Sequence, residues 1–166
     1  MWCVRRVRLA GDSLCFQEIF GVNEHIRDVT SRFAREGYLA AAPELFHRTG
    51  PGFESGYTDM TPGRTHAQAT TDEGLAADIR ATFDWLQNSG GAKPGVAAID
   101  YCMGGRVATL AAMTVPLACS VAYYGGIAPH PFYRVNLIGR FGEIQCPILF
   151  CWAVSTALSN RSRSTW

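Results

Sequence analysis

The segment that most constrains the fold runs from Val96 to Arg106 and reads VAAIDYCMGGR. Its apolar first half is typical of a buried strand, the glycines indicate a tight turn, and the residues after them favour a helix. At such a turn the side chain of Cys102 stands clear of the sheet, and the next backbone N–H and the helix N-terminus face the same small volume. The pattern predicts a nucleophilic thiol whose pKa the helix dipole lowers. The alternative is a buried core cysteine, since free cysteines are among the most buried residues.

Short apolar runs alternate with helical patterns along the chain. The runs that are typical of strands are residues 13–16, 38–42, 95–99, 118–124 and 147–152. One helix is expected between an N-cap at Asn23 and a stop at Gly37, and another over residues 106–113. Because strands that alternate with helices form parallel βαβ units, the sequence predicts a three-layer α/β fold with a mostly parallel sheet.

The clearest helix pattern begins near residue 70. Thr70 and Glu73 match a capping box. The apolar stripe that follows at helical spacing comprises Leu75, Ile79, Phe83 and Leu86. Before this helix, residues 44–70 are rich in glycine and proline and predict a long loop, which is either a functional lid or a surface excursion. Residues 1–12 receive no assignment.

Composition excludes several classes of protein. The net charge of +1 offers no field for nucleic acid or for an anionic membrane surface. No apolar run approaches the ~20 residues of a membrane span, and the basic N-terminus lacks the apolar stretch of a secretory signal. The six cysteines are scattered without a Cys-x-x-Cys pair, which argues against a disulfide framework and a zinc site. We therefore expect a soluble cytoplasmic protein of one domain, with reduced thiols and with neither metal nor cofactor.

Four groups of residues stand in a characteristic order. They are residues 17–23 (QEIFGVN), 37–38 with 42–46 (GY and APELF), 101–105 (YCMGG) and 123–126 (YYGG). In this order they resemble the landmarks of the dienelactone hydrolases, or carboxymethylenebutenolidases. The resemblance covers roughly residues 14–150 and implies an α/β-hydrolase fold, incomplete at its C-terminus. We expect a hydrolase-like domain over residues 13–152, with atypical termini at 1–12 and 153–166.

The resemblance also implies the site. Proteins of this family use a cysteine nucleophile, which is Cys102 here. The family's glutamate, which contacts the resting thiol, corresponds to Glu18, and the N–H groups of Met103 and Ile19 are expected to form the oxyanion hole. The residues allow this placement of Glu18, because the ends of adjacent strands in an open α/β sheet line one crevice. The alternative is an ordinary solvated carboxylate.

Two features depart from the family pattern. The family has a small residue two positions before the nucleophile, where this chain has Asp100, so we expect a looser turn. After Phe150 the family continues to an aspartate and a histidine, but the tail here holds no Asp, Glu or His, as a truncated or frameshifted reading frame would give. All four histidines come earlier, and the Pro-flanked His130 is expected on the surface; the others are His25, His47 and His66.

Three functions remain open from the sequence. The first is a hydrolase that opens an ester or lactone bond in a small molecule through Cys102. The second is a catalytically inactive remnant of such an enzyme, and the third is a ligand-binding α/β module. No nucleic-acid or membrane partner is expected, and the sequence does not give an oligomeric state.

Overall fold

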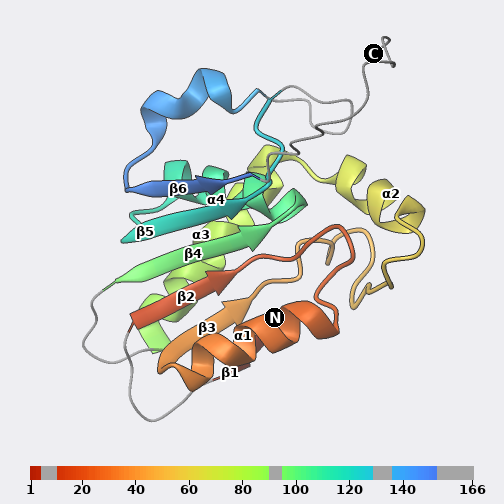
Figure 1. Cartoon of the computed structure of the whole chain (residues 1–166), viewed down its shortest axis with the longest axis horizontal. Coiled ribbons are helices and arrows are strands. Elements are labelled where there is room, and N and C mark those ends of the chain that lie inside the picture. Colours follow the sequence, from red (N-terminus) through yellow and green to blue (C-terminus); the bar gives the residue numbers. More distant parts are fainter. Residues whose placement is uncertain (5–10, 90–94, 129–135, 153–166) are drawn as a thin grey trace, which may run out of the picture.

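The computed structural model describes residues 1–4, 11–89, 95–128 and 136–152 and contains one six-stranded sheet of order β1-β3-β2-β4-β5-β6 (Figure 1). The strands are β1 (Trp2–Val4), β2 (Gly11–Cys15), β3 (Tyr38–Ala42), β4 (Val96–Tyr101), β5 (Cys119–Tyr123) and β6 (Ile148–Cys151). Every neighbouring pair is parallel except β1 with β3, which is antiparallel. The predicted mostly parallel sheet is confirmed.

Helices cover both faces of the sheet (Figure 1). They are α1 (Glu24–Arg35), α2 (Thr61–Ala69), α3 (Asp72–Ser89), α4 (Met103–Thr114) and the short 3₁₀ helix η1 (Ile138–Glu143). On one face, Ile26 of α1 packs with Cys15 and Ala40 of the sheet. On the other face, α3 and α4 bury a larger apolar cluster that includes Ile79 and Val107. This is the expected three-layer arrangement.

The ends of the helices follow local chemistry. Asn23 caps α1 as predicted, because its side-chain oxygen accepts the N–H of Ile26 at 3.2 Å. The start of α3 differs by one residue from the prediction. Thr71 accepts the N–H of Gly74 at 3.0 Å and so caps α3, whereas Thr70 donates to the carbonyl of Ala67 and closes α2. All four residues of the apolar stripe on α3 are buried.

Three elements were not expected from the sequence, namely β1, α2 and η1. Helix α2 occupies the last third of the segment 44–70, so the prediction of a loop there is wrong for residues 61–69. Pro62 lies in its first turn, where proline needs no N–H partner. Helix α4 also begins three residues before the predicted start at Arg106, directly after Cys102.

No helix among the described residues has the length and apolarity needed to cross a membrane.

Candidate active site

Cys102 lies in a strained turn between β4 and α4. Its backbone has φ 59° and ψ −120°, a region that residues other than glycine rarely adopt and that costs about 1–3 kcal/mol. The N–H of Cys102 donates to the carbonyl of Tyr123 at 3.0 Å, which ties the turn to the end of β5. The strand, tight turn and helix expected from the sequence are confirmed.

Two glycines allow β5 and α4 to meet at this turn. A Cβ atom on Gly105 would lie 2.7 Å from the Cα of Gly125, and a Cβ on Gly125 would lie 2.3 Å from the carbonyl carbon of Gly105. Real Cβ atoms do not approach other atoms so closely. The close backbone approach predicted from the two glycines after Met103 is therefore present, with Gly105 as the residue that permits it.

Asp100 is fully buried beneath the start of α4. Its Oδ1 accepts the N–H of Tyr101, and burial raises its pKa well above the usual value. A Cβ on Gly104 would lie 1.4 Å from Asp100 Oδ1, so the carboxyl group fits only because residue 104 has no side chain. The looser turn expected from Asp100 is not found, because Gly104 provides the space.

The pKa of the Cys102 thiol is raised overall, although the start of α4 acts in the predicted direction. Burial is the largest cause. The backbone N–H of Met103, at the start of α4, bonds to the thiol and lowers the pKa, but the nearby carboxyl groups of Glu18 and Asp100 raise it further. The favourable contribution of the helix N-terminus is thus outweighed by burial and by two carboxyl groups.

Glu18 follows β2 and is 7% exposed, so it is not a solvated carboxylate. Its Oε2 accepts a hydrogen bond from the Tyr57 hydroxyl at 2.8 Å. Its charge also acts on Cys102 and on Tyr124, whose pKa rises to about 12, chiefly because of burial. The structure therefore brings Glu18 and Cys102 into one electrostatic environment, at the ends of two adjacent strands.

The backbone around Ile19 is held from both sides. The carbonyl of Glu18 accepts bonds from the N–H of Gly21 and from the Gln17 side chain, each at 3.4 Å. Because the peptide is planar and trans, the N–H of Ile19 points away from that carbonyl. The carbonyl of Ile19 abuts α2, where a Cβ on Gly63 would lie 2.1 Å from it.

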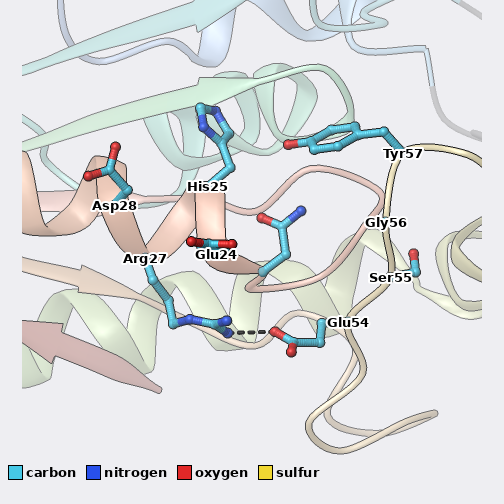
Figure 2. Close-up of a pocket in the computed structure, with 9 residues that line it drawn as sticks. Glu24, His25, Arg27, Asp28, Glu54, Ser55, Gly56 and Tyr57 are labelled. Carbon is cyan, nitrogen blue, oxygen red and sulfur yellow. Dashed lines mark hydrogen bonds and ion pairs between the residues drawn. The ribbon is translucent and has the colours of Figure 1, made fainter.

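A cavity of about 660 Å³ lies between the start of α1 and the loop before α2 (Figure 2). Its lining residues come from the first turns of α1 and from the loop before α2: Asn23, Glu24, His25, Arg27, Asp28, Glu54, Ser55, Gly56 and Tyr57. In Figure 2 the Tyr57 phenol and the His25 ring reach over the same side of the cavity. Tyr57 thus belongs both to the cavity and to the surroundings of Glu18.

The described histidines lie in different places. The centroid of the His25 ring is 5.9 Å from that of Tyr101, the residue before Cys102. His47 pairs with Asp78 and His66 with Thr49, while His130 lies outside the described residues. Across the part of the chain that the structure describes, no three His, Cys, Asp or Glu side chains are grouped to hold a metal ion.

Residues 13–158 match the model of the dienelactone hydrolase family. The chain belongs to this family. A carboxymethylenebutenolidase of Pseudomonas sp. strain P51 is 37% identical over 66% of this chain and 47% of its own length. A Synechocystis protein with the provisional name carboxymethylenebutenolidase is 41% identical over 70% of this chain and 49% of its own length.

Solved structures agree with this assignment. A Klebsiella pneumoniae protein, provisionally named a dienelactone hydrolase, superposes with a TM-score of 0.75 at 32% identity, covering 88% of this chain and 63% of that one. The chain spans about half the length of the two relatives named above. The comparisons support a dienelactone hydrolase-like domain and do not favour the inactive remnant or the ligand-binding module.

Sequence reasoning missed Tyr57. The glycine- and proline-rich composition of its loop gave the only signal, since it indicated a possible lid. The bond from Tyr57 to Glu18 joins residues 39 positions apart, and no local pattern reports a contact over that separation.

Proposed function

We propose that this member of the dienelactone hydrolase family hydrolyses an ester or lactone bond in a small molecule, with Cys102 as its nucleophile. The observation that carries the proposal is the strained turn at Cys102, where the thiol meets the N–H of Met103 at the start of α4. Strained conformations of this kind are retained where function requires a side chain to be presented.

In the proposed acylation, the Cys102 Sγ attacks the substrate carbonyl carbon. Because the pKa of this thiol is raised, the thiol carries its proton at neutral pH and needs a base. Glu18 takes that proton as the carbon–sulfur bond forms. The carbon–oxygen bond then breaks, the leaving oxygen receives the proton, and a thioester remains on Cys102. Water hydrolyses the thioester to a carboxylic acid and restores the thiol.

The proposed oxyanion hole consists of the N–H groups of Met103 and Ile19. The N–H of Met103 already points at the Cys102 sulfur, and the N–H of Ile19 points away from the turn that holds the Glu18 carbonyl. Donors placed where the carbonyl oxygen gains negative charge are each worth roughly 3 kcal/mol of activation free energy.

The proposed substrate is a small lactone or ester. The Pseudomonas relative is named for a carboxymethylenebutenolide, which is an unsaturated lactone. The 660 Å³ cavity that Tyr57 helps to line offers room for a ligand of small-molecule size, and the Tyr57 hydroxyl links it to Glu18. The proposed compartment is the cytoplasm, because free thiols fit a reducing setting. The cysteines that the structure describes as free are Cys15, Cys102, Cys119, Cys146 and Cys151.

Acylation of the intact chain by p-nitrophenyl acetate tests the proposal. We expect mass spectrometry to find one acetyl group per chain, on Cys102. Cys102→Ala should remove it, whereas the matched control Cys119→Ala should retain it. An acetyl group that persists in Cys102→Ala would overturn the assignment of the nucleophile.

A further inference from the structure

The hydroxyl of Tyr57 binds Glu18, the proposed base. It donates to Glu18 Oε2 at 2.8 Å, although 57% of the Tyr57 residue is exposed. An exposed tyrosine on a loop thus reaches a buried carboxyl group next to the candidate nucleophile. The bond occupies one carboxylate oxygen and leaves Oε1 to meet other partners.

The loop that carries Tyr57 is held in register against the Glu18 turn. The N–H of Ser55 donates to the carbonyl of Phe20 at 3.0 Å, and Gly21 forms a β-bridge with Glu54. Gly21 has φ +79°, and a Cβ there would lie 2.0 Å from the carbonyl oxygen of Phe53. These contacts fix the position of the backbone just before Tyr57. The hydrogen bond from Tyr57 to Glu18 is therefore supported by the fold and is not a chance contact of an exposed side chain.

The ring of Tyr57 is fixed as well. It packs edge-on against Phe20, with ring centroids 4.5 Å apart. Burial and the hydrogen bond to Glu18 both raise the pKa of Tyr57 above its usual value near 10. The phenol therefore keeps its proton at neutral pH and acts as the donor to Glu18.

We propose that Tyr57 is a positioning residue for Glu18: by binding Oε2 it holds the carboxylate so that Oε1 receives the proton of the Cys102 thiol. This inference rests on the proposed function, because it assigns Tyr57 a part in the acylation of Cys102. The loop before α2 then has a role in catalysis, since Tyr57 on this loop sets the orientation of the proposed base.

Tyr57→Phe tests the inference, because it removes the hydroxyl and keeps the ring that packs on Phe20. We expect the rate of Cys102 acylation by p-nitrophenyl acetate to fall by about 10- to 100-fold, which is the usual cost of misplacing a catalytic group. Tyr38→Phe is the matched control, since Tyr38 lies at the start of β3 and packs on Phe33 instead. It should leave the rate unchanged.

A double-mutant cycle separates positioning from a merely structural role. In the Glu18→Gln background, Tyr57→Phe should slow acylation by no more than about twofold, because there is no longer a base to position. A full additive loss in that background would overturn the inference, as would an unchanged rate in Tyr57→Phe alone.

A spectroscopic readout does not depend on activity. The ultraviolet titration of Tyr57, taken as the difference between the parent chain and Tyr57→Phe, should shift to lower pH in the Glu18→Gln background. An unmoved titration would mean that the two side chains are not coupled in solution.

The two proposals fail in distinguishable ways. If Cys102→Ala leaves the acylation intact, the proposed function fails. If Cys102→Ala abolishes acylation but Tyr57→Phe leaves its rate unchanged, only the role of Tyr57 fails.

Discussion

Asp100 illustrates how a single residue depends on its neighbours. It stands two positions before Cys102, where its carboxyl group is fully buried, and Gly104 provides the space for it. Within the described residues, Oδ2 of Asp100 has no hydrogen-bond partner. The buried site therefore disfavours the ionised form, and the raised pKa of Asp100 is the result.

Asp100→Asn should stabilise the fold at neutral pH. Well below pH 4, Asp100 is protonated in the folded and the unfolded chain alike, so its effect on stability there does not change with pH. Above pH 4 the unfolded chain ionises while the folded chain keeps its proton, so stability falls until the raised folded pKa is passed. Asparagine has nearly the same shape and retains the oxygen that accepts the N–H of Tyr101.

Urea unfolding at pH 4.5 and pH 7.5 measures this effect. The gain for Asp100→Asn should exceed about 1 kcal/mol at pH 7.5, since one pKa unit corresponds to about 1.4 kcal/mol, and should shrink at pH 4.5. Asp28→Asn is a control of opposite sign, because a hydrogen bond from Arg32 lowers the pKa of Asp28. A gain for Asp100→Asn that is equal at both pH values would contradict the argument.

At the scale of elements, the carboxylate of Asp72 contacts arginines from two other helices, α4 and η1. Arg106 of α4 is buried and donates to both oxygens of Asp72, at 3.0 and 3.1 Å, in the first turn of α3. Arg140 of η1 also approaches Asp72, at 3.8 Å. Because α4 begins directly after Cys102, this ion pair ties the helix that follows the candidate site to α3.

Asp72→Ala should destabilise the fold by about 3 kcal/mol or more, since it leaves the buried Arg106 without the carboxylate that faces it. Thermal or urea unfolding measures the loss. Glu143→Ala is the control within the same network: Glu143 binds Arg140 at the exposed surface, and its loss should have little effect. Equal losses in the two variants would show that burial of Arg106 is not the cause.

The elements that were predicted correctly carry local signals, and those that were missed do not. Asn23 and Gly37 bound α1 through their own chemistry, so the sequence located that helix well. Helix α2 contains Pro62 and Gly63, which are poor helix formers, and Gly63 is explained only by the carbonyl of Ile19 against which it packs. Strand β1 is held by its pairing with β3, and the pattern of its own residues does not predict that pairing.

For the molecule as a whole, the parallel sheet explains why the candidate site forms. Strands β2, β4 and β5 run in the same direction, so Glu18, Cys102 and Tyr124 follow their ends at one edge of the sheet. The alternation of strands and helices predicts that residues after adjacent parallel strands meet at one edge, whereas the choice of Glu18 came from the family resemblance. The sequence could not predict the raised pKa of Cys102, because the burial and the two carboxyl groups that cause it come together only in the folded chain.

The site as a whole predicts that deacylation limits turnover of the 166-residue chain. Among the described residues, the groups that act on the Cys102 thiol are Met103, Glu18 and Asp100, and no histidine is among them. Asp100 is sealed from water, and in the proposed acylation Oε1 of Glu18 faces the thiol, so neither carboxyl group is placed to deprotonate a water molecule that attacks the thioester. General-base catalysis of such a step is typically worth 10²–10⁴-fold.

With p-nitrophenyl acetate we therefore expect a burst of about one equivalent of p-nitrophenol, followed by a steady phase at least about 100-fold slower. Fusing the remaining C-terminal part of the Pseudomonas relative after Phe150 should speed the slow phase and leave the burst unchanged, because the family pattern places its aspartate and histidine there. A control fusion in which that histidine is replaced by alanine should stay slow. Steady turnover by the unfused chain at the burst rate, lost in Cys102→Ala, would instead show that a base is already present, and His25 beside Tyr101 would be the first residue to replace.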